Sequence, residues 1–433
     1  MDAIMTIVDP IIQFFRTPPF LLGFIAIVGL IAQKKAVSEI IRGGFMAAFG
    51  MFLITFGVDV LVESILPVNQ LAEGVVDDPD AGGIGQESYT EQYGSTIGVA
   101  MVLGFVLHVL IALFTKVKTI FLTGHFLWWM PFIFVAIGVG AGLPEWGLII
   151  WGAVLSALYW SFMPYFLRPY SRAVLGDDSF TLGHPSAILA LISGTIAKYV
   201  GNKEKSTEDL NLPKGFSFFR EISIMGALVI FITFLVTGLG GGEAFFSNAY
   251  RDAELTDMAL FPYALEQGLQ FGVGLLILLY GVRLLVNEIV PAFEGISTKI
   301  IKGAQPAYDA PLFFNYKPNA VIIGFIVAMI TSTIFIIIFN AIGLFVVALI
   351  PLIIPSFFEC GLASVMAEGQ GGLRGAVIGT FFAAIFMVVI LGISTYFFRE
   401  TIQDWILIFG GNDMSLWGSI TGGIAELFSG LFG

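Results

Sequence analysis

Long runs of apolar residues are the feature that most limits what this chain can fold into. About twenty consecutive apolar residues are needed for a helix to cross the hydrocarbon core of a bilayer. Eight runs of this kind occur near 18–33, 43–66, 96–115, 146–167, 221–240, 264–286, 320–343 and 375–398. Only 12% of the residues are charged, about half the share in a typical soluble domain. These features predict an all-α polytopic membrane protein.

Four further apolar stretches are interrupted by Gly, Pro or His. They lie around 122–142, 180–200, 344–366 and 402–432. Such stretches are typical of extra spans, re-entrant hairpins or interfacial helices. The sequence therefore predicts about ten or eleven transmembrane helices with re-entrant hairpins.

The distribution of charge predicts the orientation, because short cytoplasmic loops carry an excess of Lys and Arg. The segment 72–94 has six carboxylates and no Lys or Arg, which predicts an acidic extracellular loop. The segment 198–220 is rich in lysine and predicts a cytoplasmic loop. Arg168 and Lys198 then share a side, so 180–197 must enter the membrane and return. We expect a multi-pass protein of the cell inner (plasma) membrane with its N-terminus outside.

Two short motifs place a Gly-His pair at the start of an apolar stretch. They are Leu122–His125, with the letters LTGH, and Thr181–His184, with the letters TLGH. Glycine permits close backbone approach, and a neutral imidazole offers one donor and one acceptor, which suits a polyhydroxylated ligand. The alternative is that each histidine only satisfies backbone groups in the protein interior. Polar residues at membrane depth favour a functional role.

Two carboxylates are further candidates for a ligand site. Glu359 is a lone acid between two phenylalanines and Cys360, so it should face a cavity, pair with another group, be protonated, or reach water at a re-entrant tip. Asp309 lies in the polar segment 294–319, where it can accept hydrogen bonds from a sugar or belong to a solvated loop. His108 has no polar neighbours in sequence, which predicts a helix-packing hydrogen bond instead.

Several function classes are excluded. The net charge of −12 argues against nucleic acid, and the single cysteine excludes a disulfide scaffold or a multi-cysteine metal site. The sequence has no phosphate loop or dinucleotide fingerprint, so no cofactor or metal is expected. No soluble stretch is long enough for a separate catalytic domain. Energy for transport must then come from an ion gradient or from partner proteins.

A series of motifs in constant order resembles the ascorbate-type membrane IIC component of the bacterial phosphoenolpyruvate-dependent sugar phosphotransferase system. The motifs are LTGH, SALYW (156–160), FTLGH (180–184), KEKSTEDLNLP (203–213), YGVRLLVNEIVPAFEGIS (280–297) and YKPNAVIIGF (316–325). The resemblance implies a single IIC domain over 1–433, with a core (transport) domain and a V-shaped dimerisation domain. It also implies a homodimer with an elevator-like movement, and separate soluble IIA and IIB partners. Cys360 is not the phosphate-donor cysteine, which belongs to IIB.

The resemblance also implies the substrate-binding residues. Ligand contacts fall on three residues and supporting backbone on three others, namely His125, His184 and Asp309, then Thr123, Gly124 and Gly183. Ascorbate carriers follow their histidines with glutamines, whereas this chain has Trp129 and Pro185 there. Glu359 stands where a Ser-Asn pair is expected. Trp129 and Glu359 therefore join the predicted site, and the substrate is ascorbate or a related pentitol, ketose or sugar acid.

Two other functions fit the same sequence. One is an ion-coupled secondary carrier that kept the fold without phosphotransfer, with Glu359 as the proton-coupling acid. The other is a non-transporting sensor that binds a sugar and recruits a regulator, although the sequence shows no soluble signalling domain. Uptake without IIA or IIB would identify the carrier. In the phosphotransferase interpretation, the IIC chain orients the sugar and supplies no catalytic residue of its own.

Overall fold

The computed structural model describes residues 10, 13–14, 17–73, 83–210, 221–240 and 258–432. Six helical segments in these ranges are long and apolar enough to cross a membrane. They are α3 (Val37–Glu73), α4 (Gln86–Phe114), α6 (Glu145–Leu175), α10 (Leu260–Lys299), α12 (Pro318–Ala341), and the segment Ile353–Phe397, which ends in α14 (Gly361–Phe397). The predicted polytopic helical architecture is confirmed at this level.

Shorter α-helices also occur in the described ranges. They are α2 (Pro18–Ala32), α5 (Gly124–Gly140), α7 (Ala187–Val200), α8 (Ile222–Gly240), α11 (Pro311–Phe314), α13 (Ile353–Pro355), α15 (Gln403–Phe409) and α16 (Asp413–Phe432). Each of the eight predicted apolar runs overlaps a helix. Large apolar side chains on the long helices are exposed, for example Phe56 (54%), Leu269 (58%) and Ile337 (63%). A bilayer would cover these surfaces.

Two predicted loops fall partly outside the described residues. Of the acidic loop 72–94, residues 74–82 lie outside them, and α4 already begins at Gln86. Residues 86–94 are therefore helical, which corrects the predicted end of that loop. Of the cytoplasmic loop 198–220, residues 211–220 lie outside the described residues, and α7 extends to Val200.

A small parallel sheet was not predicted. Its strands are β1 (Thr119–Phe121), β2 (Thr181–Leu182) and β3 (Gln305–Tyr308), in the order β1-β3-β2. Ile120 is in register with Pro306, and Thr181 with Ala307. Strands of two to four residues are too short to show a period-2 pattern in sequence. The prediction of an all-α fold is thus correct for the long elements and wrong for these three segments.

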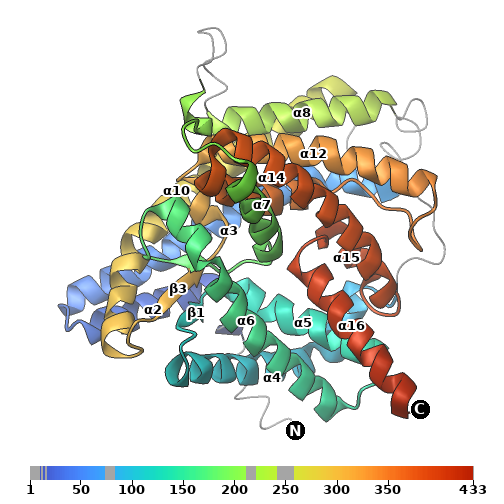
Figure 1. Cartoon of the computed structure of the whole chain (residues 1–433). Helices are drawn as coiled ribbons and strands as arrows, with labels where there is room; N and C mark the ends of the chain where they lie inside the picture. Colours follow the sequence, from blue (N-terminus) through green and yellow to red (C-terminus); the bar gives the residue numbers. More distant parts are fainter. Residues whose placement is uncertain are drawn as a thin grey trace.

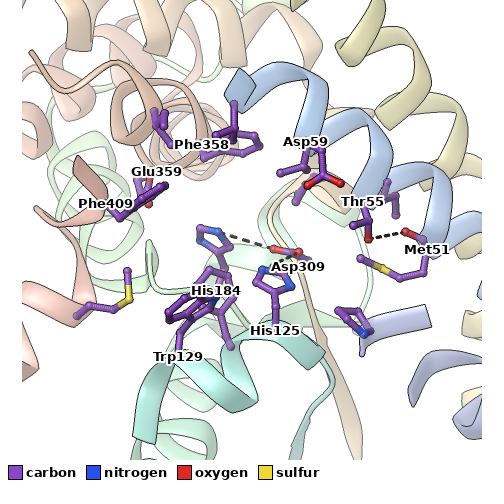
Figure 2. A pocket seen from close by; sticks show the side chains of 18 of the residues that line it. Met51, Thr55, Asp59, His125, Trp129, His184, Asp309, Phe358, Glu359 and Phe409 are labelled. Atoms are coloured by element: carbon purple, nitrogen blue, oxygen red, sulfur yellow. Dashed lines mark hydrogen bonds and ion pairs between the residues drawn. The ribbon is translucent and has the colours of Figure 1, made fainter. Parts of the chain in front are cut away.

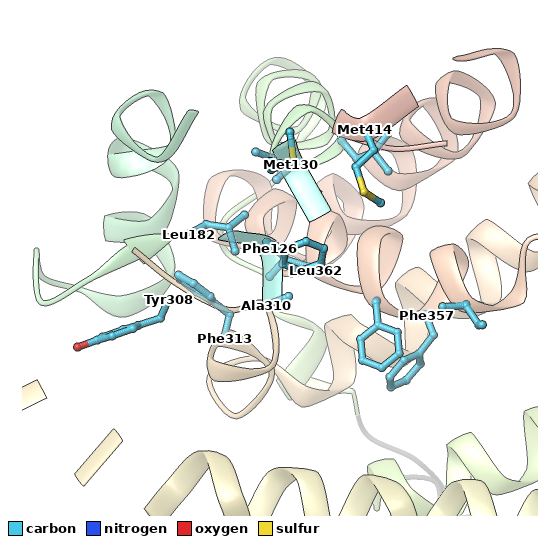
Figure 3. Close-up of a cluster of buried hydrophobic side chains, with 14 of the residues drawn as sticks. Phe126, Met130, Leu182, Tyr308, Ala310, Phe313, Phe357, Leu362 and Met414 are labelled. Atoms are coloured by element: carbon cyan, nitrogen blue, oxygen red, sulfur yellow. The ribbon is translucent and has the colours of Figure 1, made fainter. Parts of the chain in front are cut away.

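Helices pack around this sheet and against one another (Figure 1). Helices α5, α6, α7, α14 and α16 contact one another near the sheet, whereas α2, α3, α8 and α10 pack together. Glycines permit close approach of α3 and α10, since a Cβ on Gly281 would lie 2.7 Å from the carbonyl oxygen of Gly50. Figure 3 shows the buried cluster around the sheet, which includes Phe126, Leu182 and Tyr308.

Candidate functional site

Three polar side chains gather at one edge of the small sheet. His125 is the second residue of α5, which follows β1; His184 follows β2; and Asp309 follows β3 directly. Because the strands are parallel, their carboxyl ends lie at the same edge. Residues beyond the carboxyl ends of parallel strands are a common place for ligand sites. The sheet therefore brings together three residues that are far apart in sequence.

Asp309 lies between the two imidazoles (Figure 2). Its Oδ2 is 3.7 Å from Nε2 of His125, and its Oδ1 is 3.7 Å from Nε2 of His184. Both separations exceed the length of a good hydrogen bond. Asp309 Oδ1 also accepts the backbone N–H of Ala310 at 2.7 Å. The facing atoms of the three side chains thus keep hydrogen-bonding capacity for a ligand.

The tautomer of His184 follows from its hydrogen bonds. Its Nδ1 accepts the backbone N–H of Ser186 at 3.1 Å and lies 2.8 Å from the Ser186 hydroxyl. A nitrogen that accepts a hydrogen bond carries no proton, so the proton of the neutral ring is on Nε2. That Nε2–H group points toward Asp309 and the cavity between them.

The two Gly-His motifs contact each other directly. The Thr123 hydroxyl donates to the carbonyl oxygen of Gly183 at 2.6 Å. Gly183 in turn donates its N–H to the carbonyl of Tyr308 at 2.7 Å. A Cβ on Gly183 would lie 2.8 Å from the carbonyl oxygen of Ala307, so only glycine fits beside β3 without a shift. At Gly124 a Cβ would lie 2.8 Å from Cα of Pro18 in α2.

A cavity of about 320 Å³ opens at this edge of the sheet. Five of the predicted residues line it: His125, Trp129, His184, Asp309 and Glu359. The other three, Thr123, Gly124 and Gly183, support the backbone behind it. Residues of α3, among them Thr55 and Asp59, form the opposite wall. The cavity therefore lies between the sheet-bearing helices and α3, and its size suits a small molecule.

Aromatic rings form one wall of the cavity. Trp129 stacks on Trp405, with ring centroids 4.9 Å apart and an interplanar angle of 26°. Trp405 packs against Phe409 at 5.2 Å. Such a wall can cover the apolar face of a sugar ring while polar groups bind its hydroxyls. Trp405 and Phe409 were not predicted, since aromatic residues in an apolar sequence are most often packing residues.

Glu359 lies on the π-helical turn Ser356–Cys360 and lines the cavity on a different side from Asp309 (Figure 2). Its Oε1 accepts a hydrogen bond from the Asn412 side-chain amide at 2.9 Å. Its Oε2 is buried and has no hydrogen-bond partner in the part of the chain that the structure describes. π-Helical turns often occur at functional sites, and a buried polar oxygen without a partner needs one. A bound ligand hydroxyl would supply it.

Asp413 was missed by the sequence reasoning and holds the His184 turn in place. It is fully buried. Its Oδ1 accepts the backbone N–H of Ile188 in the first turn of α7, and its Oδ2 accepts the hydroxyl of Tyr159, each at 2.7 Å. Its own N–H donates to the carbonyl of Pro185 at 2.7 Å. A carboxylate at a helix N-terminus is stabilising.

His108 does not belong to the site. Its Nε2 accepts the backbone N–H of Phe121 at 3.0 Å, and its Nδ1 is 2.8 Å from the hydroxyl of Ser161. The ring thus connects α4 to β1 and α6. This agrees with the predicted packing role.

A known family of membrane permeases matches most of the chain. Residues 13–413 match the model of EIIC-GAT, the sugar-specific permease component of the phosphotransferase system. The chain belongs to this family. The predicted membership of the phosphotransferase system is confirmed, and the permease is a multi-pass membrane protein.

A curated relative of this permease is more narrowly described. It is the ascorbate-specific phosphotransferase EIIC component of Mycoplasma pneumoniae, which is 24% identical over 418 aligned residues. The alignment covers 84% of this chain and 63% of the relative. The chain thus spans less than two thirds of that protein's length.

Proposed function

We propose that this permease carries ascorbate or a related small sugar or sugar acid, bound between His125, His184 and Asp309. One observation supports this most strongly. Two imidazoles from separate motifs lie at 3.7 Å from the two oxygens of one buried carboxylate, at the wall of a cavity of about 320 Å³. The spacing leaves donors and acceptors available for vicinal hydroxyl groups.

The surrounding residues define how such a ligand would bind. Asp309 accepts hydrogen bonds from ligand hydroxyls, and the Nε2–H of His184 donates one. Trp129 covers the apolar face of the sugar. Glu359 Oε2, which lacks a partner among the described residues, accepts a hydroxyl at the far end. A ligand with polar groups at both ends and an apolar face satisfies all four contacts.

In the proposal, sugar bound at this site is carried across the membrane and then phosphorylated by partner proteins. The helices around the sheet form the core domain and carry the sugar past the group that contains α3 and α10, in an elevator-like movement within a homodimer. A separate soluble IIB, charged by IIA, then phosphorylates the sugar in the cytoplasm. The product is an anion and is trapped there. The permease contributes orientation of the sugar rather than a nucleophile.

The docking surface for IIB is proposed on the basic cytoplasmic side. Arg168 and the lysines of 198–220 belong to it. Arg172 forms a bidentate ion pair with Asp178, at 2.8 and 2.6 Å, so its charge is already engaged. The plasma membrane and an outside N-terminus follow from the same charge distribution.

A second candidate function rests on Glu359. A buried carboxyl oxygen without a partner in a transport cavity is also what a proton-coupled carrier requires. That carrier would move the sugar without phosphorylating it. Glu359→Gln would then abolish coupled accumulation, whereas it would leave uptake dependent on phosphoenolpyruvate in the phosphotransferase proposal.

Uptake into proteoliposomes distinguishes these functions. The purified permease is reconstituted and supplied with radiolabelled ascorbate, with and without phosphoenolpyruvate and the soluble phosphotransferase proteins. Uptake that needs the phosphate donor and is lost in His184→Ala supports the proposal. Uptake without the donor supports the ion-coupled carrier. The absence of ascorbate uptake under every condition rejects ascorbate as the substrate.

A further inference from the structure

A groove lies where α14 is broken, away from the sugar cavity. Gly371 and Gly372 leave the helical conformation, and Gly372 has a φ of +60°. The segment 201–210 packs into the break: Asn202 donates its N–H to the Gly371 carbonyl at 2.8 Å, and the carbonyl of Lys205 accepts the N–H of Leu373 at 2.7 Å. A Cβ on Gly372 would overlap the Asn202 carbonyl, so this close contact requires glycine.

The groove has a volume of about 530 Å³ and two kinds of wall. Lys205 and Arg374 provide positive charge, and the remaining wall is mainly aliphatic. The full lining is Asn202, Lys205, Leu373, Arg374, Val377 and Ile378. Both cations are exposed, and neither forms an ion pair within the described ranges. They are therefore available to an anionic group.

The aliphatic wall continues along α14. Val377 and Phe381 are 37% and 39% exposed, and their spacing of four residues places them on one face of the helix. This face belongs to the apolar segment Ile353–Phe397, which is long enough to span a membrane. Arg374 lies one turn before Val377. The groove therefore has positive charge at one end and an apolar track that runs from it along a membrane-spanning helix.

We propose that this groove binds an anionic phospholipid. Lys205 and Arg374 bind the phosphate, and an acyl chain lies along Val377, Ile378 and Phe381. Basic pockets at the cytoplasmic ends of membrane helices are suited to anionic headgroups, and Arg binds phosphate in a bidentate manner. A free phosphate would use only the charges, and a soluble partner would not reach the apolar track. The lipid alone matches both walls.

Native mass spectrometry of the full-length permease tests the proposal. The delipidated protein is titrated with phosphatidylglycerol and with phosphatidylcholine of the same chains. Each basic residue near a headgroup changes affinity about fivefold, so Lys205→Gln with Arg374→Gln should weaken one phosphatidylglycerol site about twenty- to thirtyfold. The matched control, Lys299→Gln with Lys302→Gln, removes the same charge at the end of α10 and should leave that site unchanged.

Two further measurements distinguish a bound lipid from a free phosphate or a protein partner. Val377→Asn keeps both charges and should still weaken the binding of phosphatidylglycerol to the groove. Glycerol 3-phosphate, which has no acyl chains, should not displace phosphatidylglycerol at equal concentration. Equal binding of both phospholipids, or equal loss in the control variant, would overturn the proposal. Effective competition by glycerol 3-phosphate would show an anion site without a lipid. Lys205 also belongs to the proposed IIB docking surface, so a double variant that loses IIB but keeps its phosphatidylglycerol would show that these cations serve protein docking alone.

Discussion

Replacing Asp413 should weaken both the fold and the proposed sugar site. In Asp413→Ala, the N–H of Ile188 loses its acceptor, and the hydroxyl of Tyr159 keeps only its weaker contact with the carbonyl oxygen of His184 at 3.3 Å. An N–H left without a partner costs about 1–3 kcal/mol, and loss of a hydrogen bond to a charged group costs about 1.5–3 kcal/mol, so the two changes together cost about 2.5–6 kcal/mol. Because the same carboxylate positions the turn that carries His184, sugar affinity should fall as well.

Thermal unfolding of the purified permease in detergent, followed by sugar binding, measures these effects. Asp413→Asn keeps one acceptor oxygen and should lose about half as much stability. Asp404→Ala removes an exposed carboxylate of α15 and serves as the control.

A double-mutant cycle refines this test. Tyr159→Phe alone removes one of the two hydrogen bonds that the Asp413 carboxylate accepts. Its effect on stability and that of Asp413→Ala should therefore not add in the combined variant. If Asp413→Ala unfolds like the wild type, or if the two effects are fully additive, the carboxylate does not hold this turn.

Substitutions at Gly183, Trp129 and His108 also probe the region. Gly183→Ala should reduce sugar affinity at least about tenfold, because its Cβ would lie 2.8 Å from the Ala307 carbonyl oxygen, whereas Gly140→Ala should have no effect on binding isotherms. Trp129→Ala should weaken sugar binding about tenfold in an equilibrium binding assay, and Trp129→Phe should recover most of the lost affinity. If Trp129→Ala binds the sugar as tightly as the wild type, the aromatic wall does not contact the ligand. His108→Ala should lower the melting temperature and leave the affinity of the folded protein unchanged, and a selective loss of binding would contradict its packing role.

The long helices could be predicted because hydropathy is a property of each segment alone. A run of apolar residues has to be buried in lipid or protein whatever the rest of the chain does. The two Gly-His motifs were equally visible, since glycine before a polar residue interrupts an apolar run. Their meeting at Asp309 was implied only by family resemblance. Its physical cause is the strand β3, which pairs with both β1 and β2.

The strands and the supporting residues could not be predicted because they depend on distant partners. β2 has two residues, and its strand conformation comes from pairing with β3. Tyr159 and Asp413 are 254 residues apart and are ordinary polar residues in their own segments. The predicted end of the acidic loop failed for a related reason. Glutamates at 87 and 91 suggested a solvated loop, yet they stand in the first turns of α4.

Equilibrium binding to an Asp309 variant tests the central claim most directly. Purified wild-type permease is first titrated with ascorbate and related radiolabelled pentitols, ketoses and sugar acids, and the sugar that binds is used for Asp309→Asn. The amide oxygen can still accept the Ala310 N–H, so the fold should persist. Loss of a charge-assisted hydrogen bond costs about 1.5–3 kcal/mol, which predicts binding about ten- to a hundredfold weaker. Unchanged affinity in a folded Asp309→Asn protein would show that the sugar binds elsewhere.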